Sequence, residues 1–419
     1  MTFGCRLNRA EALDEEARYL SEGWELTDDH AEADRFVVRG CSVTARAERD
    51  CQKLIEHLRK KYPTKRVIVQ GCIKDKTTAP GAWATVLARR RRDETLAAAD
   101  DAAVPVPTRT ARAYLKVQDG CAGKCTFCIV PQFRGASKSV DFTAALDKAK
   151  RFVDAGYHEI VVTGCNLSLY CSQGKRLPDL LAALADLTPP PSHNPRAPQT
   201  SQTSETSETS QTSFCRIRLG SVEPCTCAIE TVHAMAEHPN VCRFLHLPVQ
   251  SGSEQVLKAM RRPYTAKDVT EVVTLATELM PNLGLGCDLM TGFPGETERD
   301  FFATKGLLNR LPFNNAHIFP YSERPGTLAV AFPLQVAKDI RSARAHILSK
   351  AIREKRSDFA KSFTGKTVEI IVEDAKTGRG WTDEYLPCEP VIGAPQRKSL
   401  LRVFVTKVKD GTLFGRPCK

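Results

Sequence analysis

The chain has 419 residues, 60 Lys and Arg against 49 Asp and Glu, and 16 cysteines. This length predicts two or three domains, and no apolar run is long enough for a membrane-spanning helix. Residues 1–5 lack the pattern of a secretory signal, so we expect a cytoplasmic protein whose cysteines serve metal or redox chemistry rather than disulfides. The net charge of +11 favours an anionic partner such as RNA.

Residues 1–80 are predicted to form a small α/β unit. Its expected helices and strands cover residues 8–24, 35–39, 44–61 and 66–70. Alternation at this spacing predicts a parallel sheet. Residues 81–110 follow as a linker, and we interpret its basic run, Arg89–Arg92, as a solvated helix face, with an RNA contact as the alternative.

Between residues 111 and 333 strands and helices alternate again. Six strands are expected at 114–118, 159–163, 216–221, 244–249, 283–291 and 316–321, with helices at 142–155, 177–187, 227–238, 253–260, 266–280 and 298–310. This pattern favours a partial (β/α)6 barrel over an open sheet. Segment 188–213 is rich in Thr, Ser and Gln and lacks the apolar side chains that offset ordering entropy, so we predict a disordered insertion there.

The C-terminal part changes character. Residues 334–363 are predicted to form a basic helical connector, and strand alternation at Thr367–Val372 and Leu400–Val408 predicts a small all-β module over 364–419. Its aromatic residues, which lie among basic ones, are Trp381, Tyr385, Phe404 and Phe414. Such a mixture suits RNA binding, but composition alone favours the interpretation that these rings form the core of a small barrel.

Three cysteines, Cys121, Cys125 and Cys128, lie directly after the first expected barrel strand. A structural zinc site needs four ligands, and no fourth Cys or His lies at a short spacing. Three thiolates can instead bind three irons of a 4Fe–4S cluster and leave the fourth iron open to a small molecule. The C-x3-C-x2-C spacing, with Phe127 before the last cysteine, resembles the radical S-adenosylmethionine (SAM) superfamily.

A second set of cysteines, Cys5, Cys41 and Cys72, is spread along the first unit, and each member follows a glycine. Cys41 and Cys72 come directly after expected strands. The carboxyl ends of neighbouring parallel strands meet at one edge, so the three thiolates could converge there on a second cluster. The alternative is that they are small buried hydrophobic residues, which is how we interpret the other ten cysteines.

With these residues in view, the whole chain resembles a radical-SAM methylthiotransferase. That family has an N-terminal three-cysteine domain, a radical-SAM barrel and a C-terminal TRAM β-barrel that holds RNA. The matching segments are residues 4–8, 40–44, 69–72, 118–121, 216–224, 246–252 and 292–297. Arg6, Asn8, Ser42–Thr44, Phe319–Thr327 and Gly380–Tyr385 resemble the branch that acts on N6-threonylcarbamoyladenosine in tRNA. N6-isopentenyladenosine and a ribosomal-protein aspartate, the substrates of the other branches, stay open.

The resemblance implies that a methylthio group replaces the C2 hydrogen of the modified adenosine next to the anticodon, with two 4Fe–4S clusters and two SAM molecules. The cluster on Cys121, Cys125 and Cys128 would cleave SAM, and the second would present sulfur. The SAM contacts that it implies are Phe127, Gly164, Asn166, Ser221, Glu223, Gln250 and Gly292. The TRAM module and helix 338–361 would hold the tRNA anticodon arm, and a reducing partner would supply electrons to a monomer.

Two rival interpretations remain. A radical-SAM enzyme with a single cluster would use Cys5, Cys41 and Cys72 only as structural residues. A non-catalytic RNA-binding protein with a zinc-stabilised fold would contain no iron. Iron content distinguishes the methylthiotransferase from both rivals, because each cubane holds four irons. We expect about eight irons per chain for the methylthiotransferase, about four for the single-cluster enzyme and none for the zinc protein.

Overall fold

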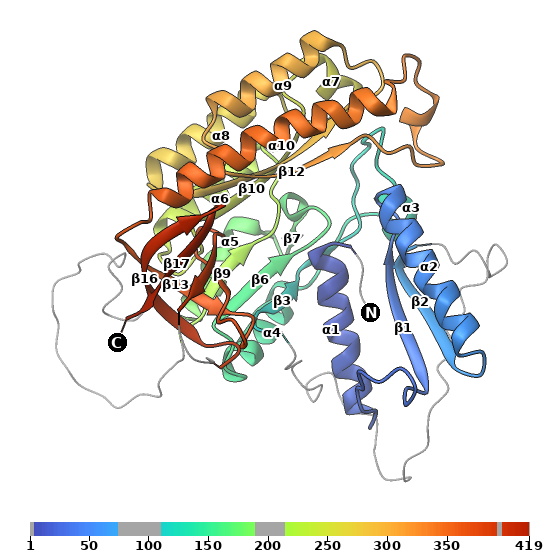
Figure 1. The fold of residues 1–419 in the computed structure, drawn as a ribbon, viewed down its shortest axis with the longest axis vertical. Coiled ribbons are helices and arrows are strands. Elements are labelled where there is room, and N and C mark those ends of the chain that lie inside the picture. Colours follow the sequence, from blue (N-terminus) through green and yellow to red (C-terminus); the bar gives the residue numbers. More distant parts are fainter. Residues whose placement is uncertain (1–3, 74–109, 189–213, 392–395, 419) are drawn as a thin grey trace.

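The structure is a computed structural model that describes residues 4–73, 110–188, 214–391 and 396–418 (Figure 1). The expected linker and the expected insertion lie outside the described residues, apart from Thr110 and Thr188 at their edges. Figure 1 shows an N-terminal unit on one side of a large central unit and a small β-barrel on the other. Within the described ranges, no helix is long and apolar enough to cross a membrane.

The N-terminal unit contains α1 (Arg6–Ser21), β1 (Arg35–Cys41), α2 (Ala45–Lys61) and β2 (Arg66–Cys72). The parallel sheet is confirmed, because β1 and β2 pair in parallel with Cys41 opposite Cys72. Helix α2 begins where the Thr44 hydroxyl accepts a hydrogen bond from the Ala47 amide. Its buried Ile55 and Leu58 pack on the strands. Helix α1 instead packs on the central unit, against Tyr114 and Val161.

Six parallel strands form the central unit, namely β3 (Ala113–Lys116), β6 (Glu159–Thr163), β9 (Arg216–Leu219), β10 (Phe244–Gln250), β11 (Gly284–Thr291) and β12 (Asn315–Pro320). They make two three-stranded sheets, β3-β6-β9 and β10-β11-β12. Parallel bridges between Ile217 and Val241 and between Ser221 and His246 join β9 to β10. The strands therefore follow one another in chain order, as the predicted partial (β/α)6 barrel requires.

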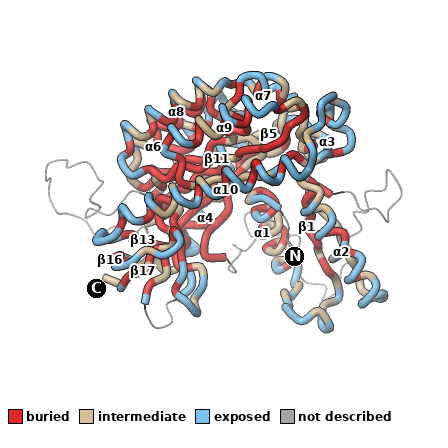
Figure 2. The backbone as a smooth tube through the Cα atoms, turned by 45° about the horizontal axis from the view of Figure 1, so that its top comes forward, coloured by how far each residue is buried: buried red, intermediate tan, exposed pale blue. Residues whose placement is uncertain are grey.

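Six helices cover the outer face of these strands. They are α4 (Phe142–Asp154), α5 (Leu177–Asp186), α6 (Thr226–Glu237), α7 (Glu254–Ala259), α8 (Ala266–Leu279) and α9 (Glu298–Arg310). Leu245, Leu247, Leu285 and Leu289 belong to the main apolar core. Side chains alternate along a strand, so the residues between them, such as His246, face the inside of the barrel. Figure 2 shows these buried strands beneath helices with exposed outer surfaces.

Short elements complete the central unit and carry several of its loops. They are β4 (Gln118–Asp119), α3 (Val130–Arg134), β5 (Lys138–Ser139), η2 (Leu167–Leu169), β7 (Cys171–Ser172), β8 (Lys175–Arg176) and η3 (Leu328–Ala331). The sequence pattern did not predict them, because elements this short show no periodicity.

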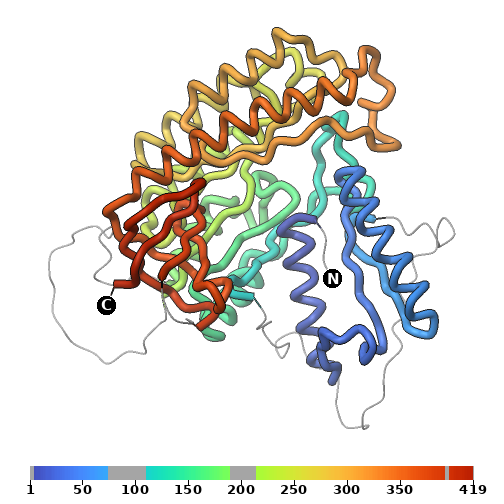
Figure 3. Tube along the Cα trace, viewed as in Figure 1, coloured from blue at the N-terminus to red at the C-terminus, as the bar shows by residue number. Residues whose placement is uncertain are grey.

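The long helix α10 (Lys338–Lys361) crosses the central unit and leads into the C-terminal barrel (Figure 3). It begins later than the predicted connector because Leu334 has a left-handed φ of 57°, which an α-helix cannot contain. The barrel is closed in the order β13-β14-β15-β17-β16. Its strands are β13 (Thr367–Val372), β14 (Gly380–Thr382), β15 (Pro387–Pro390), β16 (Leu400–Lys409) and β17 (Thr412–Pro417).

The interpretation that the aromatic residues form the core of this barrel is wrong. The buried core consists mainly of aliphatic side chains and includes none of the four rings. Trp381 and Tyr385 stack on each other, with centroids 4.5 Å apart, and Tyr385 lies 4.8 Å from the Phe244 ring of the central unit. These rings therefore join two domains instead of filling one.

A buried ion network reinforces this junction. Glu159 is fully buried and accepts hydrogen bonds at 2.7 Å from both Arg216 and Arg218. The same guanidinium groups donate to carbonyl oxygens of the C-terminal barrel, from Arg216 to Trp381 at 2.8 Å and from Arg218 to Thr382 at 2.9 Å. The barrel is thus docked near the amino ends of β6 and β9.

Candidate active site

The first cysteine set lies in the loop between β4 and α3. This loop folds closely around its own sulfurs, because the Gly123 amide donates to the Cys121 Sγ at 3.3 Å. A Cβ at Gly123 would lie 3.1 Å from that sulfur and 3.8 Å from the Cys125 Sγ. Burial, together with the neighbouring Cys125 and Cys121 thiols, raises the pKa of Cys128 to about 11. The structure therefore brings these three thiols together.

The second set gathers at the carboxyl edge of the N-terminal sheet. Cys41 and Cys72 are direct partners in the register of β1 and β2. Gly4 has a left-handed φ of 100°, and a Cβ there would lie 3.1 Å from the Cys41 Sγ, so the chain beside Cys5 presses against Cys41. Burial raises the pKa of both Cys41 and Cys72, and the Cys5 thiol is close enough to add to each shift.

The chemistry of both donor sets fits a 4Fe–4S cluster. All six cysteines are free, and each set supplies three thiols. In the part of the chain that is described, no three His, Cys, Asp or Glu side chains are close enough to bind a single metal ion. A cubane needs wider spacing than one ion does, since each thiolate binds a different iron.

One arginine connects the two sets. The Arg134 Nε donates to the Cys72 Sγ at 2.9 Å. Its Nη1 donates to Asp119 at 2.9 Å, just before the first cysteine loop, and to Glu11 at 2.8 Å. Its Nη2 donates to Asn8 at 2.7 Å. A single guanidinium thus ties α1, the second cysteine set and the central barrel together. The sequence analysis missed Arg134, because a lone arginine in a short helix carries no signal.

A second arginine that the sequence analysis missed lies beside the first set. The Arg262 Nη1 donates to the Cys125 Sγ at 3.1 Å, and its Nη2 donates to the Glu223 carboxylate. The Arg262 Nε donates to the Tyr264 hydroxyl at 2.8 Å. Glu223, an expected SAM contact, is thereby held next to the first cysteine loop.

The other expected SAM contacts follow successive strands of the barrel. Gly164 and Asn166 follow β6, Ser221 follows β9, Gln250 ends β10, Gly292 follows β11, and Phe127 lies in the first cysteine loop. Functional residues of such barrels gather at this edge. Gln250 fits a ligand contact best, because its buried Oε1 has no hydrogen-bond partner in the structure and its φ is 66°.

Three of these residues also have clear structural roles. The Asn166 side chain accepts a hydrogen bond from the Ser168 amide and so caps η2. Phe127 packs edge-on against Phe293, with centroids 6.3 Å apart. A Cβ at Gly292 would lie 2.2 Å from the Cγ of Arg341, so the approach of α10 is enough to require glycine there.

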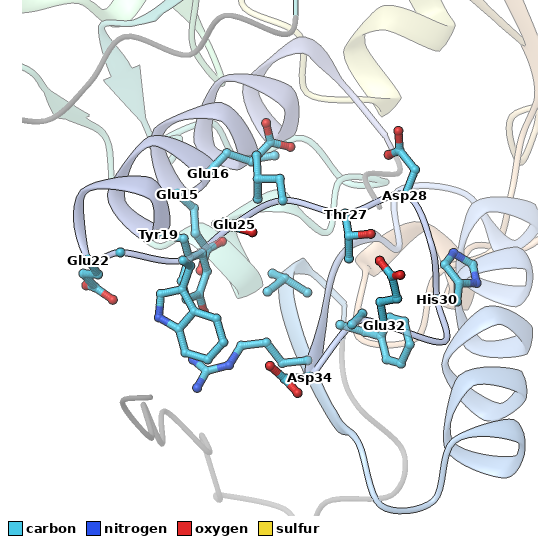
Figure 4. Close-up of a pocket in the computed structure, with 18 of the residues that line it drawn as sticks. Glu15, Glu16, Tyr19, Glu22, Glu25, Thr27, Asp28, His30, Glu32 and Asp34 are labelled. Carbon is cyan, nitrogen blue, oxygen red and sulfur yellow. The ribbon is translucent and has the colours of Figure 1, made fainter. Parts of the chain in front are cut away.

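A cavity of about 400 Å³ lies elsewhere, in the N-terminal unit (Figure 4). Its lining includes Glu15, Tyr19, Trp24 and Arg35, and the Arg35 guanidinium lies 3.7 Å from the Trp24 ring centre. Arg35 begins β1, whereas Cys41 ends it. The cavity is therefore at the end of the strand opposite to the cysteines, where parallel sheets do not usually bind ligands.

Comparison with known proteins agrees with this geometry. The Radical SAM superfamily matches residues 115–308, and the uncharacterized protein family UPF0004 matches residues 1–81. Threonylcarbamoyladenosine tRNA methylthiotransferase MtaB of Bacillus subtilis is 29% identical over 92% of this chain and 88% of its own length. The tRNA-2-methylthio-N(6)-dimethylallyladenosine synthase of Bordetella avium is 31% identical over 89% of this chain and 81% of its own length.

A solved structure of the radical SAM methyltransferase TsrM from Kitasatospora setae matches 58% of this chain and 42% of its own, at 16% identity and a TM-score of 0.42. The barrel and the superfamily match define a radical-SAM enzyme, with a 4Fe–4S cluster and SAM as its cofactors. More particularly, the chain belongs to the radical-SAM tRNA methylthiotransferase family, and it is a transferase. The expected family is thus confirmed.

Proposed function

We propose that this enzyme replaces the C2 hydrogen of N6-threonylcarbamoyladenosine, next to the anticodon of a tRNA, with a methylthio group. The observation that carries the proposal is the pair of three-cysteine sets that Arg134 ties together. A radical enzyme that only cleaves SAM needs one such set, whereas sulfur transfer needs a second site at which sulfur is presented. MtaB relatives, whose name specifies threonylcarbamoyladenosine, support this substrate.

When bound, the cluster on Cys121, Cys125 and Cys128 supplies the electron that cleaves SAM, and the cluster on Cys5, Cys41 and Cys72 supplies an open iron for sulfur. The protein's own residues hold the reactants. Glu223, which bonds Arg262, would accept hydrogen bonds from the SAM ribose. The orphaned Gln250 Oε1 accepts one more donor from the same ligand. Two SAM molecules are used in each turnover, one for the radical and one for the methyl group.

The C-terminal barrel and α10 are proposed to hold the anticodon arm, in a cytoplasmic monomer that receives electrons from a reducing partner. The basic residues on the exposed surface of α10 are Lys338, Lys350, Arg353 and Lys361. Arg341 and Arg344 are buried, and they donate to the Tyr321 carbonyl and the Glu296 carboxylate. Only part of the basic helix is therefore available for phosphate contacts.

Anaerobic reconstitution with iron and sulfide tests this proposal. We expect about eight irons per chain, and about four in a Cys121→Ala/Cys125→Ala/Cys128→Ala variant. Mass spectrometry of nucleosides should then detect the methylthio product on an anticodon stem-loop that carries threonylcarbamoyladenosine. Four irons in the wild type and none in the variant would support a single-cluster enzyme. Bound zinc without iron would support a non-catalytic protein. Product only on an isopentenyladenosine stem-loop would favour the alternative branch, to which the Bordetella avium relative belongs by name.

Arg262 is expected to set the reduction potential of the first cluster. Its hydrogen bond to the Cys125 sulfur and its positive charge both stabilise the reduced cluster. In an Arg262→Gln variant we expect a more negative potential in a redox titration followed by electron paramagnetic resonance, together with slower SAM cleavage. Arg261→Gln removes a neighbouring exposed charge and is the matched control. Equal potentials in the two variants would contradict this role.

A further inference from the structure

A polar cluster lies inside the barrel, on the face of the strands opposite to the apolar core. His246 on β10 contacts Asp288 on β11, with 3.0 Å between Nε2 and Oδ1. His317 on β12 lies 3.6 Å from the same carboxylate oxygen. Gly286 makes room for this arrangement, since a Cβ there would lie 2.6 Å from the His246 Nδ1. The sequence analysis assigned no role to these three side chains.

Arg6 reaches toward this cluster from the N-terminal unit. Its Nη1 donates to the Leu219 carbonyl at 3.3 Å, at the end of β9, and its guanidinium lies 5.2 Å from the Tyr385 ring centre. It is close enough to Asp288 and His317 to interact electrostatically with both. The N-terminal unit, the barrel and the C-terminal barrel thus all contribute to the surroundings of one guanidinium.

The guanidinium of Arg6 has unused capacity for an anion. Its side chain is half-buried, and none of the described carboxylates forms an ion pair with it. Asp288, the acidic group on which it acts, is already bonded to His246. By contrast, Arg39 in the same unit and Arg134 on α3 of the central unit are both paired with Glu11. A guanidinium offers five donors in a planar fork that matches a carboxylate.

We propose that Arg6 binds the carboxylate of the threonylcarbamoyl substituent and thereby distinguishes this substrate from an N6-prenylated adenosine. The proposal rests on the function proposed above. In adenine only N1 separates C6, which bears the substituent, from the reacting C2, so both lie on one edge of the base. C2 must face the cluster site that includes Cys5, and Arg6 is the next residue along the chain. The exposed ring of His317 can add a second donor.

An apolar prenyl group would leave the remaining N–H donors of this guanidinium without an acceptor and partly removed from water, which costs binding free energy. Arg6 therefore acts in two ways, as an attractive contact for one substituent and a penalty for the other.

Binding of fluorescent anticodon stem-loops to the reconstituted holoenzyme, without a reductant, tests the proposal. Three stem-loops are compared, which carry threonylcarbamoyladenosine, its neutral threonine methyl ester or isopentenyladenosine. We expect the wild-type enzyme to bind the acid about 10- to 100-fold more tightly than the ester, as a charge-assisted hydrogen-bonded pair allows. Arg6→Gln should remove this ratio, and Arg6→Lys should retain part of it.

Arg9→Gln is the matched control, since Arg9 lies on the same helix, is exposed and faces Tyr114 instead. It should leave the acid-to-ester ratio unchanged. Equal binding of acid and ester by the wild-type enzyme would overturn the proposal even if Arg6→Gln failed to fold. So would an unchanged ratio in Arg6→Gln. Failure of the proposed function is distinct, since it appears as methylthio product on the isopentenyladenosine stem-loop alone in a separate turnover assay.

Discussion

Replacing Glu159 by glutamine is expected to destabilise the protein by about 3–5 kcal/mol, because two buried guanidinium groups then lose the buried carboxylate that neutralises them. The Glu159 side chain is fully buried and bonds Arg216 and Arg218 at 2.7 Å, and Arg112 lies 3.5 Å away. Glutamine cannot neutralise these guanidinium groups, and they also dock the C-terminal barrel. Unfolding in urea, followed by circular dichroism, measures the loss.

Glu230→Gln is the control for this measurement. Glu230 pairs with Arg176 near the surface, at 2.8 Å, and the Arg176 and Glu230 side chains are 46% and 38% exposed. Its removal should cost less than about 1 kcal/mol. Similar losses for the two variants would contradict the structural role of the buried network.

The same network predicts a pH dependence of stability. Burial by itself would raise the pKa of Glu159, but the charges of Arg218, Arg216 and Arg112 outweigh it and hold the pKa far below its usual range. A carboxylate with a depressed pKa stabilises the folded state above its unfolded pKa, about 4.3, and this contribution is lost as the pH falls below that value. The urea midpoint of the wild type should therefore fall more steeply on acidification than that of Glu159→Gln.

Replacing Arg134 by glutamine is expected to separate the two half-reactions. The variant removes the buried group that holds the second cysteine set against the barrel. Breaking such a pair costs about 3–5 kcal/mol, which corresponds to a loss of about a hundredfold or more in the docked arrangement. Methylthio product should fall by that factor, whereas SAM cleavage, which needs only the first set, should fall much less. Parallel assays of 5′-deoxyadenosine and methylthio nucleoside give the ratio.

Lys148→Ala provides the comparison for Arg134. Lys148 on α4 bonds Asp14 on α1 at 2.6 Å, across the same junction but nearer the solvent. Its loss should leave the ratio of the two products almost unchanged, because exposed ion pairs contribute little. If Arg134→Gln kept the two activities coupled as in the wild type, the bridging role would be excluded.

Local pattern was enough to predict most of the architecture. Period and alternation identified the strands of the central barrel and most of its helices within a few residues, and β6 and β13 agree with their predicted bounds. The sequence also pointed to both three-cysteine sets, to the first by its spacing and to the second by its position after expected strands. These features depend on neighbours in the chain, and local propensity and burial pattern report such neighbours directly.

The tertiary structure alone decided which distant residues meet. Arg134 contacts Cys72, Arg262 contacts Cys125, and Arg6 approaches Asp288. Trp381 and Tyr385 pack on the central unit rather than inside their own barrel, which composition did not predict. Each contact joins residues that are far apart in sequence, and its partner depends on how whole elements pack. A long polar side chain is compatible with many partners, so only the packed fold selects one.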